Sequence, residues 1–319
     1  RARIDARLSR LYAFAGRPED AVAVATRALE SARAAGYVSV EIDACKRLGV
    51  LLGQRGDPVR AREVMEEGLA LAERTGDLAN QGSLRNNLLT LRFAGGESLA
   101  VEELDEAVAL ARAAGDRVSL NNMLANIGTF ALMHGDVERG RATLRESLRV
   151  ASRLGQRPLE AHVTGGLGQS YLRENKLDKA LTYLQRGLEL AQEAGNVRLL
   201  GAAWVRLAAH GRAAGQPELA LGHARSGLEC AERSRYLDLI VHTHGEAALC
   251  LLDLGRAAEA AEALVPARAM LAEHELRGQV ARHRAVEALV AQANGDLEAA
   301  LVHRAAVAQA AGGFGQDEV

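Results

Sequence analysis

The apolar residues of this chain follow the period of an α-helix, and breaks in the pattern come at regular intervals. In residues 156–195, Leu167 and Tyr171 mark one apolar face, and Leu184 and Leu188 mark the next. No segment shows the two-residue alternation of a half-buried strand. The pattern therefore predicts helices separated by short turns, and no sheet.

A turn residue followed five positions later by a small residue recurs eight times, at intervals of 39 or 40 residues. A second break, most often a glycine, divides each interval about midway. A fixed period of this size indicates stacked helical hairpins. The eight pairs are Gly16 and Ala21, Gly56 and Ala61, Gly95 and Ala100, Gly135 and Gly140, Asn175 and Ala180, Gly215 and Ala220, Gly255 and Ala260, and Gly295 and Ala300; the midway breaks are Gly36, Gly76, Gly115, Gly155, Gly195, Ser234–Arg235 and Glu275.

These intervals predict one α-solenoid over residues 1–311, with each repeat forming two helices of about 15 residues. The small and polar residues 312–319 are expected to form a flexible tail. The predicted hairpins lie near residues 2–36, 37–76, 77–115, 116–155, 156–195, 196–235, 236–275 and 276–311.

Composition narrows the class of protein. The net charge is −2 with only 3% aromatic residues, which makes nucleic-acid binding unlikely as a function. No apolar run approaches the length of a membrane span, so no membrane partner is expected. The scattered cysteines Cys45, Cys230 and Cys250 fit a reducing cytoplasm. The missing initiator methionine suggests a fragment of a longer protein.

Each repeat resembles the tetratricopeptide repeat when its turn residue is numbered fifteen. That family favours Leu at position seven, Gly or Ala at eight, a large residue at eleven, Ala at twenty and a small residue at twenty-seven. The fifth repeat matches with Leu167, Gly168, Tyr171, Ala180 and Gly187. The resemblance implies an all-α fold, a right-handed superhelix of about eight hairpins. The 40-residue period is similar to that of MalT-like and LuxR-like bacterial regulators and of peptide-sensing regulators.

The last repeat departs from this signature, with Glu287 at position seven and Arg304 at position twenty-four. Terminal repeats need a polar outer face. We therefore expect these residues to belong to a capping repeat.

No catalytic constellation is visible, so the chain is predicted not to be an enzyme, and no cofactor or metal is expected. The glycines of Gly165–Gly168 are interpreted as sites of close helix packing, because no Lys-Ser/Thr ending follows them. His242 and His244 lie two residues apart, and such side chains point in different directions on a helix. Cys45 is expected to be a buried, unreactive thiol.

The resemblance also implies that the first helix of each repeat lines a concave groove and contacts ligands through positions two, five, six and nine. These 32 positions hold eight basic and two acidic residues, a net charge of +6 on a chain of −2. Amides join the cations in the central repeats. The candidate ligand-binding residues are Lys46, Arg47, Arg85, Asn86, Asn122, Asn126, Gln169 and Arg206.

Asn and Gln side chains pair with peptide N–H and C=O groups, and Arg binds carboxylates through two parallel hydrogen bonds. The groove is therefore predicted to bind an acidic or carboxylate-bearing peptide. On the resemblance, the chain is the sensor or interaction region of a larger bacterial regulator, and it is expected in the cytoplasm. A free-standing adaptor scaffold and a small-molecule sensor remain alternatives, and the oligomeric state stays open.

Overall fold

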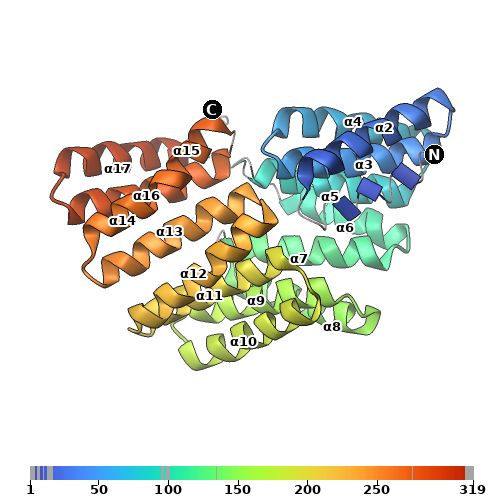
Figure 1. Cartoon of the computed structure of the whole chain (residues 1–319). Helices are drawn as coiled ribbons and strands as arrows, with labels where there is room; N and C mark the ends of the chain where they lie inside the picture. The colour runs from blue at the N-terminus through green and yellow to red at the C-terminus, as the bar shows by residue number, and fades with distance from the viewer. Residues whose placement is uncertain are drawn as a thin grey trace. The chain divides into compact units, whose positions relative to one another are not determined.

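The computed structural model describes residues 4–5, 8–9, 11–12, 17–94, 97, 101–133, 135–274 and 276–312. These residues form helices joined by short turns and contain no strand, which confirms the predicted all-α fold class (Figure 1). The helices are α2 (Pro18–Ala34), α3 (Val38–Gln54), α4 (Pro58–Thr75), α5 (Leu78–Ala94), α6 (Val101–Ala113), α7 (Arg117–Met133), α8 (Val137–Leu154), α9 (Arg157–Arg173), α10 (Leu177–Glu193), α11 (Val197–Ala213), α12 (Pro217–Ser234), α13 (Leu237–Asp253), α14 (Ala257–Ala263), α15 (Val265–Glu273), α16 (Arg277–Ala293) and α17 (Leu297–Gly312).

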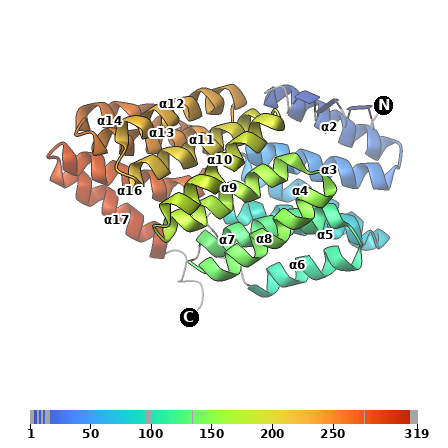
Figure 2. The ribbon, with the colours of Figure 1, turned by 90° about the horizontal axis from the view of Figure 1, so that it is seen from below.

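The chain forms two compact units, unit 1 (Arg1–Asn126) and unit 2 (Ile127–Val319), each described by itself below. In unit 1, α3 packs on α4 and α4 packs on α5. In unit 2, α9 pairs with α10 and α11 pairs with α12, and both pairs lie side by side in the second view (Figure 2). Each unit is thus a stack of helical hairpins. The predicted tail residues 313–319 lie outside the described residues.

Left-handed backbone conformations close the helices at the predicted turns. Gly36, Gly56 and Gly155 have φ values of 66°, 78° and 64°. Asn175 and Arg235 adopt φ values of 55° and 53° at positions where other repeats have glycine. Glycine, and after it asparagine, enters this region at the lowest steric cost, which confirms the reading of these residues as helix ends.

The helix starts also follow the sequence. Pro58 and Pro217 are the first residues of α4 and α12, where proline loses no hydrogen bond because the first-turn N–H groups have no helical acceptor. The carboxylates of Asp57 and Asp136 accept hydrogen bonds from backbone N–H groups three residues later, at 3.2 and 3.1 Å. These two caps stabilise the starts of α4 and α8.

Small residues at positions eight and twenty hold the two helices of a hairpin together. Ala61, Ala180 and Ala220 are fully buried. A β-carbon on Gly168 would lie 2.7 Å from Cδ2 of Leu184, so the α9 and α10 backbones approach closely at this point. The interpretation of Gly165–Gly168 as a packing segment is confirmed, since it lies within α9 and contacts neighbouring helices.

Two features of the last repeats differ from expectation. The second helix of the seventh repeat is broken into α14 and α15 at Leu264, because Pro266 lacks the N–H that would continue the helix. Glu287 does not lie on a polar outer face, as the sequence suggested, because only 2% of it is exposed. Its carboxylate instead pairs with Arg268 at 2.7 Å and Arg284 at 2.8 Å.

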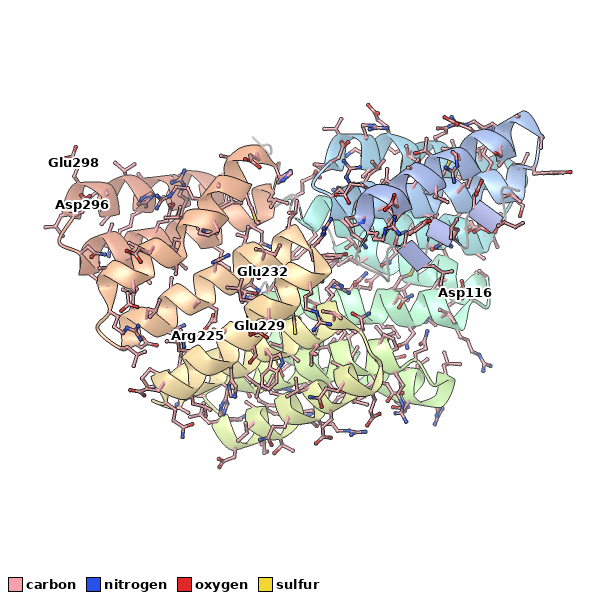
Figure 3. All side chains as sticks on the ribbon, in the orientation of Figure 1. Asp116, Arg225, Glu229, Glu232, Asp296 and Glu298 are labelled. Carbon is pink, nitrogen blue, oxygen red and sulfur yellow. The ribbon has the colours of Figure 1, made fainter. Side chains whose placement is uncertain are left out.

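The second helices carry their polar residues toward solvent. Arg225, Glu229 and Glu232 follow one exposed face of α12 at spacings of four and three residues (Figure 3). Among the described residues, no helix combines the length and the apolar character needed to cross a membrane.

Candidate ligand-binding surface

Positions two, five, six and nine of each first helix form what we call the inner row. Its candidate residues lie on α3, α5 and α7 in unit 1, and on α9 and α11 in unit 2. Arg3, Arg7 and Arg10, which contribute to the predicted charge of +6, lie outside the described residues. Every candidate ligand-binding residue lies within the described part of the chain.

Lys46 and Arg47 border one hollow of unit 1. Nζ of Lys46 lies 3.0 Å from the carboxylate of Asp43 and donates a hydrogen bond to the side-chain oxygen of Asn80. A cavity of about 330 Å³ is lined by Lys46, Arg47, Ser83 and Asn87, among others. The structure thus brings two of the predicted cations to one cavity, although Lys46 already has an acidic neighbour.

Arg85 is held in two internal ion pairs. Its guanidinium donates to Glu73 of α4 at 3.0 Å and to Glu106 of α6 at 2.8 Å. Both carboxylates come from second helices, outside the inner row whose charge the sequence counts. The charge of Arg85 is therefore balanced within the protein, and a ligand would have to compete with two carboxylates for it.

The predicted amides form a link between two first helices. Nδ2 of Asn126 donates to Oδ1 of Asn86 and to Oγ1 of Thr90, both at 3.1 Å. Asn86 and Asn126 occupy the same position in successive repeats, so the hydrogen bond joins equivalent points of α5 and α7. Asn122, one turn earlier on α7, is exposed to solvent.

In unit 2, Arg206 and Gln169 are both half-buried. A β-carbon on Gly165 would lie 2.8 Å from Nη1 of Arg206, so the guanidinium lies directly against the α9 backbone. Burial and the nearby Arg198 lower the pKa of Arg206 to about 10. Among the described residues, Arg206 forms no salt bridge, in contrast to Arg85.

Three basic residues near Arg206 were not among the candidates. Burial and the charges of Arg206 and Arg198 lower the pKa of His162 to about 3. Burial and the charges of Arg282 and Arg206 lower that of His242 to about 3. His162, His242 and Arg282 all stand at position two of their repeats. This recurrence is the sequence signal that could have identified them.

The side chains of His242 and His244 on α13 lie in two different environments. His242 accepts a hydrogen bond of 2.8 Å from Nη1 of Arg282, whereas His244 is buried and bonded to the backbone of Ala263. The prediction that His242 and His244 point in different directions is confirmed.

The thiol of Cys45 is fully buried, and burial raises its pKa to about 12. A thiol with so high a pKa is protonated at neutral pH and is a poor nucleophile. The prediction of an unreactive packing residue is therefore confirmed.

Residues 119–193 match the sequence profile of the tetratricopeptide repeat. This segment covers the hairpins built by α7 to α10. It includes most of the fifth repeat, whose residues match the tetratricopeptide signature. The match supports tetratricopeptide repeats in residues 119–193, and the turn residues before and after this segment keep the same period of 39 or 40 residues. No curated protein sequence matches the chain.

Solved structures of helical-repeat proteins superpose on the chain. The Rap conjugation gene regulator of plasmid pLS20, in complex with a Phr peptide, is 13% identical, with a TM-score of 0.61 over 88% of this chain and 79% of that one. Aspartyl phosphate phosphatase F from Bacillus subtilis is 12% identical, with a TM-score of 0.53 over 96% and 93%.

A signal-transduction ATPase with a tetratricopeptide repeat sensor, from Pyrococcus horikoshii, is 17% identical, with a TM-score of 0.54 over 85% of this chain. The chain spans 43% of the length of that ATPase. At these identities the similarity establishes the fold of stacked helical hairpins.

Proposed function

We propose that this chain is a peptide- or protein-binding tetratricopeptide domain that holds an acidic or carboxylate-bearing segment against the inner-row residues of one of its two units. The observation that carries the proposal is the gathering of cations and amides on the first helices. In unit 1, Arg47 and Lys46 border one cavity, and Asn86 and Asn126 join α5 to α7. In unit 2, Arg206 has no carboxylate partner among the described residues.

The chemistry of these groups fits an extended peptide. Amide side chains pair with both the N–H and the C=O groups of a backbone. A charge-assisted hydrogen bond shielded from water contributes roughly 1.5–3 kcal/mol. Three such contacts support micromolar affinity after the cost of ordering the peptide. The Rap regulator bound to a Phr peptide supports the idea that stacked hairpins of this kind accept a peptide.

Fluorescence anisotropy with labelled hexaglutamate and hexalysine peptides tests the proposal. We expect hexaglutamate to bind and its affinity to fall as salt is raised, since ionic strength screens charge–charge attraction. Replacing Arg47 and Arg85 with Gln together should weaken binding without adding the carboxylate repulsion that Glu would create beside Glu73 and Glu106. Equal affinity for hexalysine, or no binding of hexaglutamate, would reject the acidic ligand.

The cavity beside Lys46 and Arg47 favours one alternative. Its volume of about 330 Å³ falls in the range of small-molecule sites, roughly 300–1,000 Å³. A small-molecule sensor would raise its melting temperature with individual anionic metabolites, and such a ligand would displace no peptide. A free-standing adaptor scaffold would instead bind two proteins at once.

We also propose that the domain belongs to a larger cytoplasmic bacterial regulator and acts by binding, without catalysis. The tetratricopeptide sensor of the signal-transduction ATPase supports the first point. The structural similarity to a protein named a phosphatase means that phosphatase activity is the activity to test against the second point, binding without catalysis. Hydrolysis of a protein aspartyl phosphate by this chain would refute it.

A further inference from the structure

Four basic side chains of unit 2 come from the first helices of four consecutive hairpins. They are His162 on α9, Arg206 on α11, His242 on α13 and Arg282 on α16. Arg206 acts electrostatically on both histidines, and Arg282 donates a hydrogen bond of 2.8 Å to Nε2 of His242. We call these four residues the basic cluster.

The basic cluster is open to solvent. Arg282 is exposed, and His162, Arg206 and His242 are half-buried. A cavity of about 120 Å³ is bordered by His242 and Arg282. A small anionic group can therefore reach His242 and Arg282 through this cavity without displacing core residues.

The positive charge of Arg206 is not balanced by a carboxylate among the described residues. The charged side chain that acts on Arg206 is another cation, Arg198. Glu246 lines the cavity with His242 and Arg282 and acts electrostatically on Arg282. Its carboxylate pairs with Arg212 at 3.3 Å, and Arg212 also pairs with Asp253 at 2.7 Å. Glu246 is thus engaged by a cation outside the cluster.

Such an arrangement costs free energy in the unbound protein. A partly buried guanidinium without a counter-ion loses hydration and gains no ion pair in exchange. An oxyanion placed against Arg206 would supply that ion pair through two parallel hydrogen bonds. The imidazoles, which are neutral at pH 7, would add N–H donors.

We propose that the basic cluster of His162, Arg206, His242 and Arg282 binds an oxyanion, either a carboxylate of a peptide ligand or a phosphate group. The peptide form of this proposal rests on the proposed function, whereas the phosphate form is independent of it. Arg206 is the central contact, because its guanidinium lies against the α9 backbone at Gly165, it acts electrostatically on both histidines, and it has no carboxylate partner among the described residues.

Titration of the protein, labelled with nitrogen-15 at histidine, with inorganic phosphate at pH 7 and constant ionic strength tests the site. We expect a saturable change in the ring-nitrogen resonances of His162 and His242. The R206Q variant should weaken that response at least tenfold, and R206K should weaken it less, because Lys keeps the charge but loses the paired hydrogen bonds. The matched control R225Q removes a cation from the exposed face of α12 and should leave the response unchanged.

Two outcomes would overturn the site: a response that never saturates, which indicates ionic screening alone, or an R206K variant that folds and binds as tightly as the unmodified chain. The hexaglutamate arm separates the two proposals. Phosphate binding through Arg206 without any peptide binding would retain the site and reject the peptide function. Hexaglutamate binding that is unchanged in R206Q and R206K would retain the function and reject the peptide form of the site, and the phosphate titration would then decide the phosphate form.

Discussion

The guanidinium of Arg206 lies against the α carbon of Gly165, which belongs to the first helix of the preceding hairpin. The three atoms that a β-carbon on Gly165 would meet most closely are Nη1, Cζ and Cδ of Arg206, at 2.8, 3.3 and 3.4 Å. The absence of a side chain at Gly165 is therefore what allows Arg206 to occupy its present place. Since all three atoms belong to one flexible side chain, an added methyl group would move Arg206 and little else.

The G165A variant should therefore lose anion binding and keep its fold. Alanine stabilises a helix interior by about 1 kcal/mol relative to glycine, so the free energy of unfolding should stay level or rise. The displaced guanidinium should weaken phosphate binding at least tenfold. Urea unfolding and the phosphate titration measure the two effects. A G165A variant with unchanged phosphate affinity would show that the contact does not position Arg206.

The histidines of unit 2 predict a loss of stability in mild acid. The folded pKa values of His162 and His242 are about 3, below the usual 6.5. The unfolded chain therefore takes up more protons between pH 6.5 and pH 3, and stability falls as pH falls through that window. Each such histidine contributes a slope of about 1.4 kcal/mol per pH unit.

Urea unfolding between pH 7 and pH 5 measures this slope above the range where carboxylates titrate. The doubly substituted variant H162Q/H242Q should be less sensitive to pH than the unmodified chain. Gln at residue 242 still offers an oxygen to Arg282. His223 and His244, whose pKa values are also lowered by burial, should leave a smaller residual slope. Identical slopes in the two proteins would contradict the assignment.

The buried carboxylate of Glu287 is predicted to stabilise the last repeat through its ion pairs. Burial raises its pKa, but His283 and Arg268 outweigh that effect and hold the pKa at about 2. The E287Q variant keeps the shape and loses the charge that Arg268 and Arg284 pair with. We expect a loss of about 1–3 kcal/mol in the free energy of unfolding.

The matched control is E259Q, since Glu259 pairs with Arg256 on the exposed surface of α14. Chemical denaturation should leave E259Q indistinguishable from the unmodified chain, because exposed pairs contribute little. Comparable losses in E287Q and E259Q would mean that burial of the Glu287 carboxylate does not set its contribution.

The sequence predicted the hairpins because their turns depend on local chemistry. A left-handed residue such as Gly56 and a capping carboxylate such as Asp57 act within a few residues of themselves, so their effect is visible in the sequence. The split between α14 and α15 is also local, since it follows from Pro266. The sequence prediction did not include this split, because the helix boundaries were placed from the turn residues and Pro266 was not considered.

The binding surface was less predictable, because ion pairs join residues far apart in the sequence. A count of the charged residues in the inner row could not show that Glu73 and Glu106, which lie on other helices, neutralise the charge of Arg85. Of the two histidines at position two, His242 was considered only as a metal ligand or a packing residue, and His162 was not considered. Their contribution to a basic cluster depends on Arg206, whose lack of a carboxylate partner appears only in three dimensions.

Two glycines predict opposite effects of the same added methyl group. A β-carbon on Gly168 would lie 2.7 and 2.8 Å from Cδ2 and Cγ of Leu184, and 3.1 Å from its backbone nitrogen. The G168A variant must therefore separate α9 from α10, at a cost of about 1–3 kcal/mol. Gly222 lies within α12 with no atom within 4 Å of its β-carbon position, so G222A should gain about 0.5–1 kcal/mol from helix propensity.

Thermal and urea unfolding of the two variants decide whether close helix approach is what requires glycine at position eight. We expect the melting temperature to fall in G168A and to rise in G222A, with the same helical content in both. A G168A variant as stable as G222A would mean that α9 and α10 accommodate the methyl group by a small shift. Position eight would then hold glycine for a reason other than packing.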